Sequence, residues 1–189
     1  MDDSHLRFPP KNQNFEIILG SSSKARREIL AEMGYEFTIM ADAIMKKLKS
    51  CDQVEEMSRS TLLITADTVV VYQGAIREKP SSEEEARKFI RDYSGGSGKV
   101  VGSVVVTNLV TGSRKGGWES AEVYFLEIPD EVIDSLIEEG ITLNVAGGLM
   151  LEHPLILPLV DTVVGTADCV MGLSKTLTEK LIQEALVES

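Results

Sequence analysis

The sequence predicts an α/β protein with a mixed β-sheet. Apolar runs of strand length alternate with segments of helical apolar spacing along most of the 189 residues. Two long β segments, at residues 99–110 and 120–128, follow one another with a glycine-containing connection between them, which is typical of an antiparallel pair. A hydrophobic content of 43% and a charged content of 26% are ordinary for a globular chain, and this length suits one domain.

The first elements expected along the chain are a strand, a helix and a second strand. Residues 15–19 form an apolar strand. Residues 24–33 have the spacing of a helix that ends at Gly34, because glycine readily adopts the conformation of a helix cap. Residues 35–40 are expected to be a strand, and residues 41–49 again show helical spacing.

The middle of the chain is expected to hold a strand, a turn and a helix. An apolar strand at residues 61–65 ends at Ala66-Asp67-Thr68, and residues 69–72 continue as strand to a turn at Gln73-Gly74. Ser82 and the glutamates that follow it form a capping box, which starts a helix that reaches about residue 92. Residues 94–98 are expected to be a flexible loop.

The last third of the chain adds helices around one more strand. The two long β segments are joined through Thr111-Gly112 and Gly116-Gly117. The other expected elements are a helix at residues 130–139 that stops at Gly140, a turn at Ala146-Gly147-Gly148, a buried strand at residues 156–164, and a helix at residues 174–187 with Ser174 as its N-cap.

Charge and cysteine content exclude several classes of protein. A net charge of −11 argues against a general binder of nucleic acid or of a membrane surface, because both need a basic surface. Two cysteines without a short spacing, Cys51 and Cys169, predict a reducing compartment and no structural zinc. Residues 1–13 lack the apolar core of a signal peptide and are expected to be a flexible tail, so we expect a cytoplasmic protein.

The most informative segment is residues 19–30. Three hydroxyl groups, Ser21 to Ser23, directly follow the first strand, and a basic stretch with Arg26 and Arg27 then opens a helix. A helix N-terminus with free N–H groups, serine hydroxyls and guanidinium groups favours an anion, so the segment suits phosphate. A plain serine N-cap followed by a solvated basic turn explains the same pattern.

A second candidate lies at the end of the strand that leads into Asp67. An acidic residue flanked by Thr65 and Thr68 stands where open α/β sheets hold ligands, and its carboxylate can bind Mg²⁺ or accept a proton. A tight strand connection also accounts for it. Lys79 follows shortly after and can contact a phosphate as a point charge, although an isolated lysine is usually a surface residue.

The remaining candidates are weaker. Gly95-Gly96-Ser97-Gly98-Lys99 fails as a phosphate-binding P-loop, because Tyr93 and Val100 stand where glycine and a hydroxyl are needed. Glu152 and His153 follow a glycine turn, and a histidine beside a proline is usually structural or exposed. Trp118 is expected to be a packing residue. Cys169 has no histidine partner nearby other than His153, which argues against a thiol nucleophile.

Six segments together resemble the Maf family of nucleoside triphosphate pyrophosphatases, in order and in approximate spacing. They are residues 19–30, Ala66-Asp67-Thr68-Val69-Val70, Lys79-Pro80, Ser94-Gly95, Ala146-Gly147-Gly148 and Gly172-Leu173. The resemblance covers nearly all of the chain after the tail. The amino-acid sequence of residues 146–182 is most similar to that of plant Maf-like proteins.

The resemblance implies a Maf/ITPase-like, two-lobed fold around a bent mixed sheet with a central cleft, formed by residues 14–189 as a single domain and often assembled as a homodimer. It implies a hydrolase that cleanses the nucleotide pool. With Mg²⁺ or Mn²⁺ as the divalent cofactor, water would attack the α-phosphorus of a nucleoside triphosphate and release the monophosphate and pyrophosphate.

The resemblance also implies residue roles. Phosphate binding falls to Ser21, Ser23, Arg26 and Lys79. Asp67 takes the roles of proton acceptor and metal ligand. Three positions bear on the preferred base, namely Ala25, Thr68 and Glu152: Ala25 stands where the dTTP/UTP-preferring group has arginine, Glu152 matches the group acting on 7-methyl-GTP, and Thr68 matches the dTTP/UTP group.

One departure from the family pattern follows Met40. Family members carry an acidic segment and a helix with a lysine at this place, whereas here Met40 runs directly into Ala41-Asp42-Ala43. The gap has the form of an internal deletion, as alternative splicing produces. The loss implies a second candidate function, a catalytically impaired isoform that binds nucleotides or partners without turnover.

Overall fold

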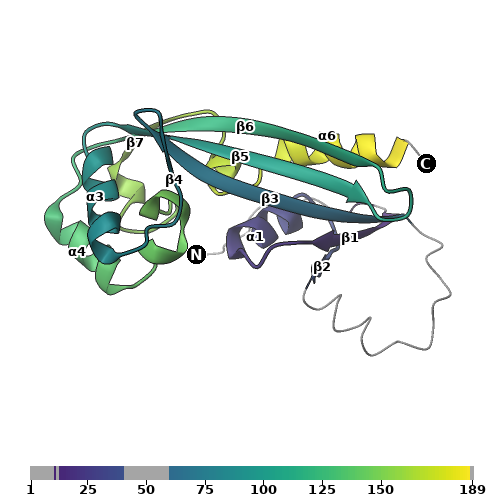
Figure 1. Cartoon of the computed structure of the whole chain (residues 1–189), viewed down its shortest axis with the longest axis horizontal. Coiled ribbons are helices and arrows are strands. Elements are labelled where there is room, and N and C mark those ends of the chain that lie inside the picture. Colours follow the sequence, from purple (N-terminus) through teal and green to yellow (C-terminus); the bar gives the residue numbers. More distant parts are fainter. Residues whose placement is uncertain (1–10, 12, 41–59, 188–189) are drawn as a thin grey trace, which may run out of the picture. The chain divides into compact units, whose positions relative to one another are not determined.

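Figure 1 shows the computed structural model, which describes residues 11, 13–40 and 60–187. The helix expected at residues 41–49 and the expectation for Cys51 lie outside this part of the chain. None of the helices in the described part is long and apolar enough to cross a membrane.

The protein has a mixed α/β fold with a seven-stranded mixed sheet, as expected. The strands follow the order β2-β1-β3-β5-β6-β7, and β4 pairs with β3 beside this path. Their bounds are β1 Glu16–Leu19, β2 Thr38–Ile39, β3 Thr61–Tyr72, β4 Ala75–Arg77, β5 Ser97–Asn108, β6 Arg114–Phe125 and β7 Val160–Val164. The helices are α1 Lys24–Glu32, α3 Glu83–Tyr93, α4 Asp130–Glu138, α5 Ala167–Val170 and α6 Lys175–Val187, with 3-10 turns at Thr142–Asn144, Ala146–Gly148 and Leu157–Leu159.

The chain divides into two compact units, with the boundaries inside β3, β5 and β6. Unit 1 comprises Met1–Ala66, Ser103–Trp118 and Leu173–Ser189. Unit 2 comprises Asp67–Gly102 and Glu119–Gly172.

Parallel strands form the centre of unit 1. β1 lies between β2 and β3 and pairs with both in parallel, so that Leu19 faces Ile39 on one side and Ile64 on the other. Parallel neighbours need a crossover connection, and α1 supplies it between β1 and β2. Leu19, Leu62 and Ile64 are fully buried, as expected for strands covered on both faces.

Helix α6 packs against the β5–β6 hairpin within unit 1. A Cβ atom on Gly117 would lie 2.8 Å from Leu177 Cδ1, so glycine lets this leucine pack directly on the strand. Gly116 and Gly117 were expected in the connection between the two β segments, and that expectation is wrong, because both lie inside β6. The expectation that Trp118 packs inside is also wrong, since its side chain is 69% exposed.

A fully buried asparagine ties the end of β5 to α6. Asn108 Nδ2 donates to the Ala185 carbonyl at 3.2 Å. Its Oδ1 accepts from the backbone N–H groups of Val110 and Thr111 at 3.0 and 3.2 Å. The side chain therefore holds both the hairpin turn and the last helix. Ser174 caps α6 as expected, accepting from Leu177 N at 3.1 Å.

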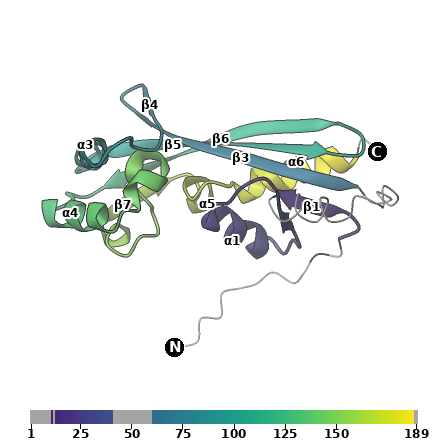
Figure 2. The same cartoon turned by 60° about the horizontal axis from the view of Figure 1, so that its bottom comes forward.

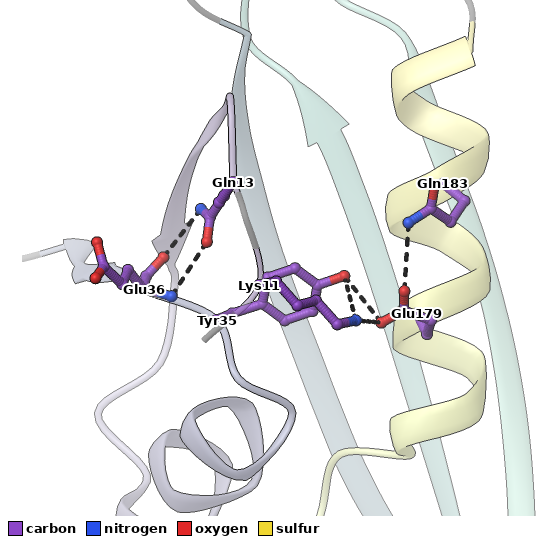
Figure 3. Close-up of polar contacts among 6 residues, drawn as sticks. All are labelled: Lys11, Gln13, Tyr35, Glu36, Glu179 and Gln183. Carbon is purple, nitrogen blue, oxygen red and sulfur yellow. Dashed lines mark hydrogen bonds and ion pairs between the residues drawn. The ribbon is translucent and has the colours of Figure 1, made fainter. Parts of the chain in front are cut away.

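Two residues of the segment expected to be a tail make ordered contacts in unit 1 (Figure 3). Lys11 Nζ donates to Tyr35 Oη at 3.0 Å and forms an ion pair with Glu179 on α6, and Tyr35 Oη donates to Glu179 Oε2 at 2.8 Å. Gln13 exchanges two hydrogen bonds with the backbone of Glu36, both 3.1 Å long. Burial alone would raise the pKa of Glu179, but the hydrogen bonds from Lys11 and Tyr35 outweigh it and lower that pKa.

Two helices lie side by side in unit 2, as both views show (Figures 1 and 2). Ile90 of α3 packs with Ile133 and Leu136 of α4 in a buried cluster. Exposed ion pairs flank this cluster, Arg91 with Asp130 at 2.9 Å and Arg87 with Asp134 at 2.6 Å. The capping box is formed in part: Ser82 Oγ accepts from Glu85 N at 3.1 Å, whereas the Glu85 carboxylate accepts from Ser81.

The strand expected at residues 156–164 is shorter and less buried than predicted. Leu157–Leu159 is a 3-10 turn, and β7 begins only at Val160. β7 pairs with β6 and ends the strand order, and Val164 is 58% exposed. Its apolar run suggested a buried strand, but the position of a strand in the sheet rather than its composition decides burial.

We expect Asn108→Ala to lower the free energy of unfolding by about 1–3 kcal/mol, because it leaves one carbonyl and two N–H groups without their partner. Urea denaturation followed by circular dichroism measures the change. The control Gln183→Ala removes an exposed hydrogen bond to Glu179 from the same helix and should change stability by less than about 0.5 kcal/mol. Equal effects of the two changes would contradict the assignment.

Candidate functional site: a serine-rich helix start in unit 1 and acidic and basic candidates in unit 2

The serine segment is fixed by a close backbone contact immediately after β1. Gly20 N donates to the Ile64 carbonyl at 2.8 Å, which continues the pairing of β1 with β3 by one residue. A Cβ atom on Gly20 would lie 2.8 Å from Thr65 Cγ2 and 3.3 Å from the Ile64 carbonyl oxygen. Glycine at position 20 therefore allows the backbone to pass close to Thr65 as it enters Ser21–Ser23, which we call the serine turn.

Three of the expected phosphate-binding residues contact one another in unit 1. Ser23 is the N-cap of α1, and its Oγ accepts from Arg26 N at 3.4 Å. Ser21 Oγ accepts from Ser23 N at 3.2 Å and from Arg26 Nη1 at 3.3 Å. The structure thus brings Ser21, Ser23 and Arg26 together at one helix N-terminus, as the sequence predicted.

The charges around this helix start favour an anion. The first turn of α1 contains no acidic residue, so the positive end of the helix dipole is not neutralised there. Lys24 is exposed and pairs with Glu28 at 3.5 Å. Arg27 has a buried Nε atom with no hydrogen-bond partner among the described residues. Ala25, expected to bear on specificity, is half-buried in the same turn.

Asp67 is placed differently from the prediction. We expected it at the end of an apolar strand or in a strand connection, and this is wrong, because β3 continues without a break from Thr61 to Tyr72. Asp67 is exposed in the middle of this strand, and Thr68 is half-buried. Successive residues of a strand point to opposite faces, so these two side chains lie on different sides of the sheet. The strand continues because β4 pairs with its last residues.

Lys79 follows β4, a short strand that is not among the elements expected from the sequence. β4 pairs antiparallel with β3, with Arg77 opposite Val70 and Ala75 opposite Tyr72. Lys79 is exposed, whereas the next residue, Pro80, is buried. The lysine therefore stands on a fixed backbone with its side chain in solvent.

Arg77 is a buried cation that no sequence motif indicated. Its guanidinium lies over the rings of Tyr72, Phe89 and Tyr93, at 4.2, 4.4 and 5.1 Å from their centroids. It forms an ion pair with Asp92 of α3. Burial alone would raise the pKa of Asp92, but hydrogen bonds from Lys88 and Arg77 lower it overall, so this carboxylate stays charged.

Glu152 and His153 have separate surroundings in unit 2. His153 Nε2 lies 2.9 Å from Glu139 Oε2, and His153 Nδ1 accepts from Leu155 N at 3.3 Å. These contacts give the histidine the structural role that the sequence favoured. Glu152 is exposed, so its carboxylate is accessible to a ligand.

Unit 2 also contains an apolar pocket that the sequence did not indicate. Aromatic rings, aliphatic side chains and glycine backbone form its wall. The lining residues are Val70, Tyr93, Gly98, Val100, Val123, Phe125, Ala146, Gly147, Leu149, Leu151 and Val170. Tyr93 and Phe125 stack within it, with ring centroids 6.2 Å apart.

A divalent cation bound by Asp67 would take most of its ligands from phosphate oxygens of a bound molecule and from water. Within the described ranges, no three His, Cys, Asp or Glu side chains are grouped so that they could hold a metal ion. Mg²⁺ commonly binds through one or two carboxylates together with phosphate oxygens and water, so a single exposed carboxylate fits such an ion. The donor chemistry at Asp67 is compatible with Mg²⁺ or Mn²⁺ brought in with a triphosphate.

Comparison with known proteins gives one consistent result. The family model described as "Maf-like protein" matches residues 16–185. The chain is 34% identical to the 7-methyl-GTP pyrophosphatase of Dictyostelium discoideum, over 89% of this chain and 96% of that protein. It is 27% identical to the dTTP/UTP pyrophosphatase of Chlamydia caviae and 28% identical to the nucleoside triphosphate pyrophosphatase of Chlamydia muridarum, each over 89% of this chain and 93% of the relative.

We expect Gly20→Ala to lower the free energy of unfolding by about 1–3 kcal/mol, because the added methyl group overlaps Thr65 and the Ile64 carbonyl. Chemical denaturation measures the loss. Gly96→Ala is the matched control, since a Cβ there meets its nearest atom, the Tyr93 carbonyl oxygen, at 3.6 Å. A Gly20→Ala protein as stable as the control would show that the close contact does not constrain the serine turn.

Proposed function

Because this chain belongs to the Maf family, we propose that it is a nucleoside triphosphate pyrophosphatase, which hydrolyses a triphosphate to the monophosphate and pyrophosphate and so cleanses the nucleotide pool. The observation that carries this proposal is the match of the family model over residues 16–185, a range that includes every candidate site residue. Relatives named as pyrophosphatases cover 89% of the chain.

We propose that Ser21, Ser23 and Arg26 bind the phosphates. The two hydroxyls and the guanidinium already contact one another at the N-terminus of α1. A phosphate there would accept hydrogen bonds from these groups and from free N–H groups of the first helical turn. The guanidinium would also neutralise charge that the phosphate oxygens gain in the transition state.

Asp67 and Lys79 receive the two remaining chemical roles in this proposal. The Asp67 carboxylate accepts the proton of the attacking water, whose oxygen forms the new bond to the α-phosphorus as the bond to pyrophosphate breaks. Lys79 places its positive charge on the triphosphate. A divalent cation held by Asp67 and the substrate's phosphates would neutralise further charge. Both side chains are exposed, as groups that meet a soluble substrate must be.

The finer architecture is part of the same proposal. We propose one Maf/ITPase-like domain, residues 14–189, with two lobes around a bent sheet, a central cleft for the triphosphate, and assembly as a homodimer. What supports the single domain is that one family model matches residues 16–185, a range that includes residues of both units. The mixed sheet agrees with the family fold.

Glu152 favours a guanine-type base. An ionised carboxylate only accepts hydrogen bonds, and guanine offers two adjacent donors, N1–H and the N2 amino group, on one edge. Uracil and thymine offer one donor between two carbonyl groups, which repel a carboxylate. Ala25, half-buried in the helix start, differs from the arginine of the dTTP/UTP group, whereas Thr68 agrees with that group. We therefore propose a modified purine triphosphate such as 7-methyl-GTP.

The second candidate, an isoform that binds nucleotides without turnover, rests on the gap after Met40. The alignment with the Dictyostelium relative spans 193 positions, more than the 189 residues of this chain, although 89% of the chain lies within it. This difference supports the proposal that some positions of the relative have no counterpart here, as an internal deletion would leave them. The place of the gap lies outside the described residues.

The purified chain with Mg²⁺ or Mn²⁺ is expected to release pyrophosphate from at least one triphosphate in a panel of 7-methyl-GTP, dTTP and UTP. Asp67→Asn keeps the size of the side chain but removes the proton acceptor, so kcat should fall at least about 100-fold. Asp161→Asn, another exposed aspartate on a strand, should leave turnover unchanged. A coupled phosphate assay measures all three.

Absence of pyrophosphate across the whole panel would contradict the pyrophosphatase proposal for this chain. Calorimetric binding of a triphosphate without turnover would then favour the second candidate. Insertion after Met40 of the corresponding segment of the Dictyostelium relative should in that case create activity, and a still inactive protein would argue against the impaired isoform.

Glu152→Gln should shift specificity from 7-methyl-GTP toward dTTP and UTP, because an amide offers both a donor and an acceptor. We expect the ratio of kcat/KM values to change by about tenfold or more. Glu138→Gln, an exposed glutamate of α4, is the control. An unchanged ratio would show that Glu152 does not contact the base.

A further inference from the structure

Arg77 is a buried cation of unit 2 with several partners. It is 8% exposed, and its Nη1 atom donates to the Phe89 carbonyl at 3.4 Å in addition to its ion pair with Asp92. Asp92 also accepts from Lys88 at 2.7 Å. Taking a guanidinium out of water is costly unless its charge and its N–H groups find partners, so these contacts fix Arg77 in one place.

The backbone after Arg77 contacts the glycine turn at Ala146–Gly148. The Glu78 carbonyl accepts from Gly147 N at 2.9 Å. Gly147 has a positive φ of 68°, and a Cβ atom there would lie 2.5 Å from Val70 Cγ2, so glycine is required at this contact. One residue on, a Cβ atom on Gly148 would meet Pro80 Cγ at 3.2 Å. Residues 78–80 are therefore held between β4 and this turn.

We propose that Arg77 is a positioning residue for Lys79. Arg77 is anchored to α3 and to three aromatic rings, and it thereby fixes the backbone of the next residue, Glu78. The Glu78 carbonyl accepts the hydrogen bond from Gly147 N, and the exposed Lys79 directly follows. This inference rests on the proposed function, because it assigns Lys79 to the triphosphate. The inference goes beyond the proposed function, because it makes the buried arginine responsible for the position of the Lys79 ammonium group.

The physical reason is the length of the lysine side chain. Lys79 has four rotatable methylene groups, so only a fixed backbone limits the volume that its ammonium group samples. Small displacements of a charged group from the transition state are costly to the rate. Lysine cannot replace Arg77, since only a planar guanidinium stacks on the rings while it donates to both a carboxylate and a carbonyl.

A double-mutant cycle tests whether Arg77 acts on the rate through Lys79. Arg77→Met is expected to lower kcat/KM about tenfold in the wild-type background, with the larger part of the effect on kcat. In the Lys79→Ala background the same change should lower it less than about twofold, because the positioned group is absent. Arg91→Met, which breaks an exposed ion pair of α3, the helix that also carries Asp92, should have no effect in either background.

Hydrogen exchange gives a second readout that needs no substrate. The Gly147 amide should exchange at least about tenfold faster in Arg77→Met than in the wild type, while the amide of Ile133 in the core of α4 keeps its rate. If Arg77→Met does not fold, Asp92→Asn replaces it, since it keeps the shape of the side chain and removes the carboxylate. Arg77→Lys should also show a lower kcat/KM and a faster exchange of the Gly147 amide than the wild type, because an ammonium group does not replace the planar guanidinium.

Equal losses of kcat/KM in both backgrounds, or equal acceleration of the Gly147 and Ile133 amides, would overturn the inference and leave Arg77 a general stabiliser of unit 2. A wild-type chain without turnover would contradict the proposed function instead. The exchange of the Gly147 amide then decides alone whether Arg77 holds this segment, and an unchanged rate overturns it.

Discussion

The parallel pairing of β1 with β3 is the constraint on which three phosphate-binding candidates, Ser21, Ser23 and Arg26, depend. The register between β1 and β3 determines where β1 ends relative to β3. The hydrogen bond from Gly20 N to the Ile64 carbonyl extends this register to the residue that precedes Ser21–Ser23. Because no side chain fits at Gly20, the turn leaves the sheet at one place. Ser21, Ser23 and Arg26 then meet at the start of α1, where the helix dipole favours an anion.

Unit 2 uses a different means to fix its polar groups. Its segment at Glu78 is held by a buried arginine, by an aromatic surround and by a glycine that allows a close backbone contact. The lysine that follows this segment is exposed. A functional side chain attached to a rigid backbone segment loses less conformational entropy when it binds its ligand.

Most of the regular elements were predictable because their signals are local. The apolar run before Ser21, the helix that ends at Gly34, the N-caps Ser82 and Ser174 and the helix before Gly140 all lie as expected. The errors fall where neighbours in space override composition. Asp67 lies within β3 because β4 extends the pairing, and Gly117 lies within β6 because that strand pairs with its neighbours β5 and β7. β7 is exposed because it ends the strand order.

The sequence by itself determined the α/β class, the serine-rich helix start and, through ordered motifs, the family to which the chain belongs. The first two follow from residue types and spacings within short windows, where helix capping and apolar periodicity act, whereas the family follows from the resemblance of motifs spread along the chain. Only the tertiary structure decided that Ser21 contacts Arg26, that Trp118 faces solvent and that Arg77 is buried among three rings. Each of these depends on residues brought together by strand pairing and helix packing, and no window of sequence contains that information.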